Sequence, residues 1–94
     1  MEQIYARVET ATVKYTQWDI SLAEGETVTN LSAVDGKAVV EIQDASGKTR
    51  TESKEMPEGS SIIDYGEIYN KDYSKVVGYR VIFSQVVGRE VEQD

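Results

Sequence analysis

The residues best suited to making specific contacts lie in one segment, where tyrosines recur at every fourth position. The segment combines three tyrosines with three carboxylates: Asp64, Tyr65, Glu67, Tyr69, Asp72 and Tyr73. A tyrosine ring brings contact area at a low cost in conformational entropy, and its hydroxyl tolerates water, so such segments are favoured at protein interfaces. The segment is therefore predicted to bind a partner protein. In the alternative, one or two of these rings close an open end of the fold as part of its core.

The composition excludes most familiar catalytic and metal chemistry. The 94 residues include no Cys and no His, so the chain has no thiolate nucleophile, imidazole base, disulfide or zinc site. Neither a Gly-x-Gly-x-x-Gly sequence nor a P-loop is present, and the acids between Asp64 and Asp72 lack the spacing of a calcium loop. A glycosidase carboxylate pair needs a deep cleft, which so short a chain rarely builds. We therefore expect no catalytic residue, no cofactor and no metal ligand.

The chain is acidic, with 17 Asp and Glu against 10 Lys and Arg and a net charge of −7. A field of this sign repels phosphate backbones and anionic lipids, so we expect a partner with a basic surface, and neither direct nucleic-acid nor membrane binding. No apolar run approaches the roughly eighteen residues of a membrane-spanning helix, and the first residues do not resemble a signal peptide. Together with the lack of disulfides, this favours a cytoplasmic location.

Side chains that suit strands dominate the chain, which has 12 Val, 7 Ile and 7 Thr against 2 Leu. With a single Pro and no internal repeat, residues 1–94 are predicted to form one compact all-β domain. We expect a small antiparallel barrel or two-layer sandwich of six or seven strands, exposing about 5,400 Å². Because residues four apart share a helix face, the tyrosine spacing allows at most one short helix near Tyr65–Lys75.

Two turns are marked by their residue types. Asp35-Gly36 is typical of a two-residue type I′ hairpin, and Asp44-Ala45-Ser46-Gly47 suits a type I turn followed by a bulge. Together these turns predict a three-stranded meander from Leu31 to Lys54. Its last strand, Lys48–Lys54, has no apolar face, which is typical of an edge strand. Arg50 and Glu52 on this strand are further candidates for partner contacts.

The remaining strands follow from alternation. Residues 4–9 alternate as a first strand, and the apolar residues then change parity between Tyr15 and Trp18, which predicts a bulge or bend near Thr16–Gln17. A strand is expected to begin at Ile62. The segment Val76–Ser84 is apolar on both faces and is the predicted central strand.

These features favour a non-enzymatic protein-binding or adaptor module that acts through an acidic, tyrosine-rich surface. Self-association would also suit a lean core, because an oligomer buries more surface. One alternative is a small acidic inhibitor, of the kind that viruses often encode, which mimics nucleic acid and blocks a nuclease or another nucleic-acid-handling enzyme. Another is a small-molecule-binding barrel or sponge, which requires an enclosed pocket.

Overall fold

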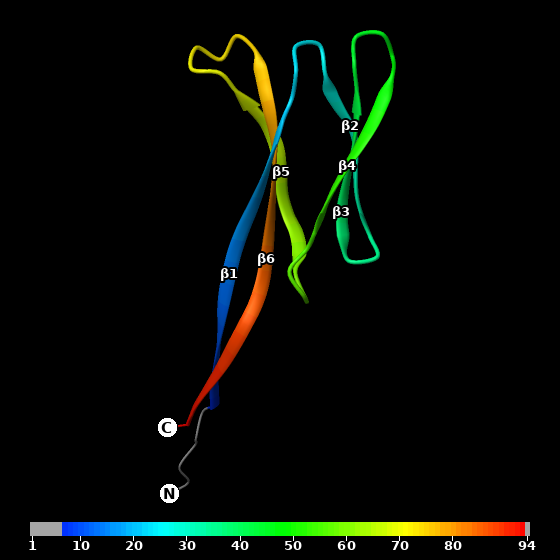
Figure 1. Ribbon diagram of the computed structural model, residues 1–94. Coiled ribbons are helices and arrows are strands. Elements are labelled where there is room, and N and C mark those ends of the chain that lie inside the picture. Colours follow the sequence, from blue (N-terminus) through cyan, green and yellow to red (C-terminus); the bar gives the residue numbers. More distant parts are fainter. Residues whose placement is uncertain (1–6, 94) are drawn as a thin grey trace, which may run out of the picture.

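The computed structural model describes residues 7–93 and contains six strands (Figure 1). In chain order these are β1 (Arg7–Ser21), β2 (Thr27–Val34), β3 (Lys37–Gln43), β4 (Thr49–Glu55), β5 (Ser61–Tyr69) and β6 (Val76–Gln93). They form two sheets with the strand orders β1-β6-β5 and β2-β3-β4, and all neighbours are antiparallel. The predicted all-β class is confirmed as a small two-layer sandwich, and the barrel alternative is wrong because the sheets do not close.

The core forms where the inner faces of the two sheets meet. Alternate residues of β3, namely Ala38, Val40 and Ile42, are at most 1% exposed. Their counterparts are Tyr79, Val81 and Phe83 on β6, together with Ile20 near the end of β1 and Leu22 just after it. Strand β6 pairs with both β1 and β5, so the prediction of a central strand is confirmed. Arg80, the lone charge of the segment Val76–Ser84, lies on the outer face of the sheet and is exposed.

Both predicted turns are present. Asp35 and Gly36 have φ of 51° and 75°, as a type I′ turn requires of its two central residues. Gly47 has φ of 89° and donates its N–H to the carbonyl of Asp44 at 3.0 Å. The meander is confirmed as β2-β3-β4, and β4 is an edge strand whose only half-buried residue is Glu52.

The described residues contain no helix, which agrees with the prediction of at most one short helix: Tyr65 and Tyr69 lie in β5, and Tyr73 lies in the turn that follows. The prediction of a bulge near Thr16–Gln17 is wrong, because the β1–β6 ladder is regular through both residues. The change of parity is accommodated instead by leaving Val13 and Tyr15 40% and 65% exposed. Of the predicted first strand, residues 4–6 lie outside the described residues.

The ladder between β1 and β6 is longer than the sandwich. It runs from the pair Arg7 and Gln93 to the pair Ser21 and Gly78, whereas β5 pairs with β6 only as far as Ser84. Beyond that point β1 and β6 form a two-stranded ribbon that extends away from the two sheets (Figure 1). The radius of gyration is 19.6 Å, against about 12 Å for a compact chain of this length.

The chain exposes 7224 Å², more than the roughly 5,400 Å² expected for a compact domain of this mass. The described part of the chain has no helix that is long and apolar enough to cross a membrane.

The turn between β3 and β4 gives a pH-dependent prediction. Asp44 Oδ1 accepts hydrogen bonds from the Ser46 hydroxyl at 2.6 Å and from the N–H groups of Ser46 and Lys48 at 2.9 and 3.0 Å. These bonds, that of the hydroxyl first, lower the pKa of Asp44 from its ordinary value of 3.8. The folded state therefore binds fewer protons than the unfolded state, so the stabilisation is complete above the unfolded pKa and is lost as the pH falls through the folded pKa.

We expect Asp44→Asn to destabilise the protein near neutral pH and to reduce the fall in melting temperature below about pH 4. Thermal unfolding by circular dichroism at several pH values measures both effects. Asp35→Asn is the control, because the Asp35 carboxylate accepts no hydrogen bond from a described residue. If Asp44→Asn shows the same acid dependence as the wild type, the turn carboxylate contributes nothing to it.

Candidate functional site

The six candidate residues between Asp64 and Tyr73 remain together in the structure. Four of them lie on the edge strand β5, and Asp72 and Tyr73 lie in the turn between β5 and β6. Tyr65, Tyr69 and Tyr73 are 61%, 46% and 79% exposed, so the alternative that these rings complete the core is wrong. The set Asp64, Tyr65, Glu67, Tyr69, Asp72 and Tyr73 is called the tyrosine surface below.

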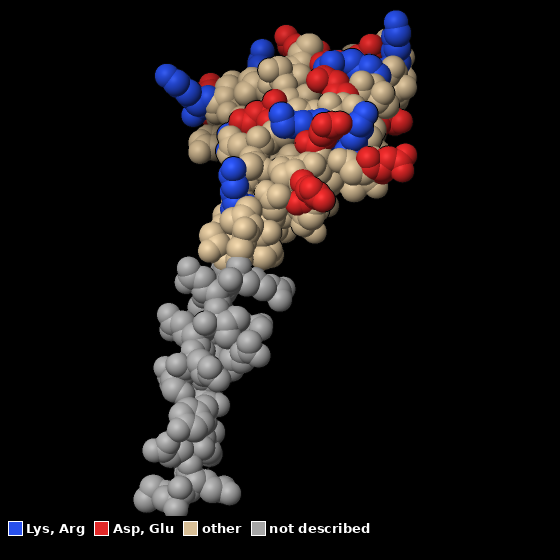
Figure 2. Space-filling model, turned by 60° about the horizontal axis from the view of Figure 1, so that its bottom comes forward, with Lys and Arg blue, Asp and Glu red and all other residues tan. Residues whose placement is uncertain are grey.

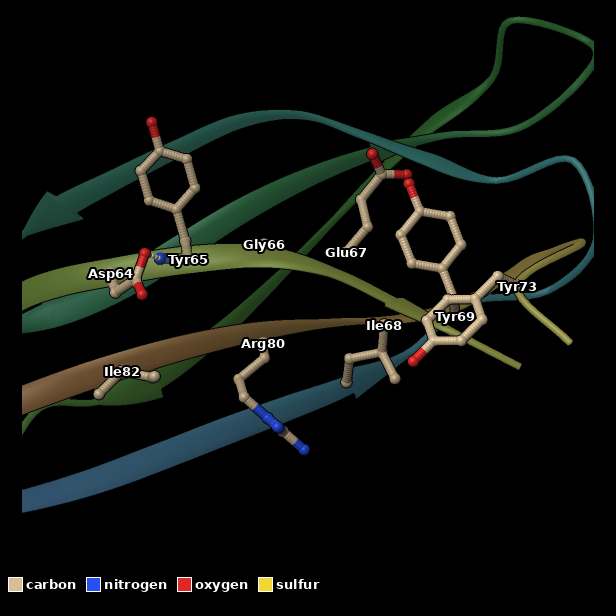
Figure 3. Close-up of a pocket in the computed structure, with 9 residues that line it drawn as sticks. All are labelled: Asp64, Tyr65, Gly66, Glu67, Ile68, Tyr69, Tyr73, Arg80 and Ile82. Carbon is tan, nitrogen blue, oxygen red and sulfur yellow. Dashed lines mark hydrogen bonds between the residues drawn. The ribbon is translucent and has the colours of Figure 1, made fainter. Parts of the chain in front are cut away.

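A shallow hollow follows the outer side of β5. Its volume is about 330 Å³, and nine residues line it: Asp64, Tyr65, Gly66, Glu67, Ile68, Tyr69, Tyr73, Arg80 and Ile82. Figure 3 shows Tyr65 and Glu67 on one face of β5, with Ile68 and Arg80 on the opposite face. Residues from both faces line the hollow, so it follows the free edge of the strand.

A second depression separates β5 from β2, the edge strand of the other sheet. It consists of two adjoining hollows of about 350 Å³ each, which share Val28, Tyr65 and Tyr79. The buried Tyr79 stacks on Tyr65 with ring centroids 6.3 Å apart. Tyr65 therefore stands between this groove and the hollow along β5, and it borders both.

The turn that carries Tyr73 is held by local hydrogen bonds. Asp72 Oδ1 accepts bonds from the Ser74 hydroxyl at 2.6 Å and the Ser74 N–H at 3.0 Å, and these bonds lower the pKa of Asp72. Tyr73 itself has φ of 60°, a left-handed conformation that disfavours a residue with a Cβ. The turn thus keeps a strained tyrosine exposed, with its ring 6.2 Å from that of Tyr69.

The charges around the hollow are mainly negative. Arg80, the one cation that lines it, donates two hydrogen bonds to Asp19, at 2.8 and 3.0 Å. This ion pair lowers the pKa of Asp19 and raises that of Arg80. Among the described residues Glu67 has no ion-pair partner, so an approaching partner meets uncompensated negative charge.

The other two candidates, Arg50 and Glu52, are not part of this surface. They lie on β4 in the second sheet, where Arg50 forms ion pairs with Glu26 at 3.0 Å and with Glu52 at 2.5 Å. Glu26 also accepts the N–H of Ala23 at 2.7 Å, and its pKa is lowered by that bond and by Arg50. Arg50 thereby ties β4 to the turn between β1 and β2. A contact role for Arg50 and Glu52 stays a prediction.

Sequence reasoning did not find the groove. Val28 and Tyr65 are far apart in the chain, and only the packing of the sheets brings them together. The alternation in the segment Val76–Ser84 predicts a strand that contains Tyr79, but it does not predict which ring Tyr79 stacks on. No local sequence pattern marks either role.

No protein-family model, curated protein or solved structure matches the chain. Among the residues that the structure describes, no three His, Cys, Asp or Glu side chains are grouped to hold a metal ion. What the site can do therefore follows from its geometry.

The difference in burial between the exposed Tyr69 and the buried Tyr79 gives a prediction about stability. Tyr69→Ala should change the free energy of unfolding by less than about 1 kcal/mol, because its ring is outside the core. Tyr79→Ala should lower it by about 3 kcal/mol, because it leaves a cavity between the sheets. Urea unfolding followed by tryptophan fluorescence measures both values. A loss for Tyr69→Ala as large as that for Tyr79→Ala would place Tyr69 in the core after all.

Proposed function

We propose that the protein is a non-enzymatic protein-binding module and that the tyrosine surface is its contact site. The observation that carries this proposal is the exposure of two tyrosines on a free edge strand and of a third in the turn that follows it, all beside an open hollow. Folding gains little from rings left in water, whereas an interface would gain most from them. The strained conformation of Tyr73 supports the proposal, because such strain persists mainly where a function requires it.

The free edge of β5 favours an extended segment of the partner. An edge strand presents backbone N–H and C=O groups that a further strand can pair with, and alternate side chains of that strand then point to opposite faces. Here one set would enter the hollow beside Gly66, and the other would meet Tyr65 and the groove. The negative charge of Asp64 and Glu67 favours Lys or Arg in the partner segment.

The nucleic-acid mimic is the weaker candidate. A mimic needs carboxylates arranged as an uninterrupted array, but Lys and Arg lie among the acidic side chains on the face shown in Figure 2. Several carboxylates are also neutralised within the chain, including Asp19 by Arg80 and Glu26 by Arg50. The sponge reading has less support, since the hollows around Tyr65 are open depressions at strand edges.

Affinity capture with the immobilised full chain tests the proposal. Lysate of the source cells is passed over the wild type, over Tyr69→Ala and over Tyr15→Ala, and retained proteins are identified by mass spectrometry after washes at low and high salt. Tyr15 is the matched control, because it is 65% exposed but lies on β1. We expect one protein to survive high salt on the wild type and on Tyr15→Ala, and to fall at least tenfold on Tyr69→Ala.

Other results would contradict the proposal. A basic nucleic-acid enzyme that high salt releases would support the mimic, because screening weakens charge-driven contacts first. A partner retained equally by all three proteins would show that the tyrosine surface is not the contact site.

A further inference from the structure

Residues 7–14 of β1 and 85–93 of β6 form a ribbon with which no other described strand pairs, and none of its described side chains belongs to the core. Within the described side chains of this ribbon, Val13, Val86 and Val87 are 40%, 53% and 50% exposed. They gather at a bulge, since the pairing moves from Thr12 and Gly88 to Val13 and Val86 and leaves Val87 as the extra residue. An isolated two-stranded ribbon is at best marginally stable in water. The described apolar side chains of this ribbon therefore lack the burial that would stabilise it.

The area left exposed matches what an interface needs. The chain exposes 7224 Å², which is about 1,800 Å² more than a compact protein of this mass. A stable protein interface buries about 800 Å² on each partner. The excess exposed area of the chain is therefore large enough for one such interface.

Charge indicates which partner covers the ribbon. By sequence the ribbon contains three basic and three acidic residues: Arg7, Lys14, Arg89, Glu9, Glu90 and Glu92. The net charge of −7 is therefore carried by the rest of the chain, which repels other copies of itself. A ribbon that by its sequence has no net charge and holds both signs does not repel a second copy of itself, as the rest of the chain does.

We propose that the ribbon is a self-association element and that its partner is a second copy of this chain. The two ribbons lie against each other around a two-fold axis, which shields the valines at the bulge from water. In this arrangement the two sandwiches project away from the shared ribbon, and their tyrosine surfaces remain free. This interface does not depend on the proposed function, which concerns β5.

The molar mass of the full chain tests this proposal. Light scattering coupled to size exclusion, from low to high micromolar protein, should give for the wild type a mass that rises to twice 10.5 kDa. The double variant Val13→Lys/Val86→Lys should return to the mass of one chain. Val34→Lys is the matched control, because Val34 is also a strand valine, 51% exposed, but lies on β2. It should keep the doubled mass.

Hydrogen exchange gives a second measurement that needs no variant. Amides of residues 85–93 should exchange at least tenfold more slowly at high than at low protein concentration, while those of β3 should not change. A mass of one chain throughout the concentration range overturns the proposal. So does an oligomer that persists in the double variant, since another surface would then hold the copies together.

Discussion

The contact between the inner faces of β6 and β3 is the interaction on which the rest of the structure depends. Tyr79, Val81 and Phe83 on one sheet meet Ala38, Val40 and Ile42 on the other. Each sheet has only three strands, so neither could bury a face without the other. Because burial of apolar area is the main favourable term in folding, this small contact holds together two sheets that share no hydrogen-bond ladder.

The small size of this core leaves the margins of the sandwich open. With β6 and β3 at the centres, β1, β5, β2 and β4 are all edge strands. Exposed edges invite pairing with other chains, and proteins usually protect them with charges, bulges or short strands. Strand β4 is protected by charged side chains along its length. Strands β2 and β5 each carry a bulge, but between them lies the groove that Tyr65 borders.

The tyrosine surface and the ribbon place unburied area at different parts of the molecule. Tyr65 and Tyr69 lie on β5 and Tyr73 lies in the turn after it, whereas the ribbon leaves the sandwich near the first residue of β5, Ser61, which pairs with Ser84. A partner protein bound at the tyrosine surface and a second copy of the chain bound at the ribbon would therefore occupy different surfaces. Two modest interfaces on one small chain would also give a dimer two equivalent binding sites, which raises the apparent affinity for a partner that presents its segment twice.

Features that depend on neighbouring residues could be predicted from the amino-acid sequence. The φ values at Asp35, Gly36 and Gly47 follow from turn chemistry, the meander follows from those turns, and the alternation in β3 and β6 follows from the two-residue period of a strand.

Features that depend on residues far apart in the chain were set only by how the strands pack in three dimensions. A spacing of four suits one face of a helix and one face of a strand alike, so Tyr65 and Tyr69 could not be assigned until β5 paired with β6. Likewise, the parity change before Trp18 has two solutions, a bulge or exposed Val13 and Tyr15, and the partner strand selects between them. The ribbon and the groove depend on where β5 and β2 lie relative to β6 in the folded chain. Those positions are set by burial of apolar side chains over the whole fold, and no single segment shows them.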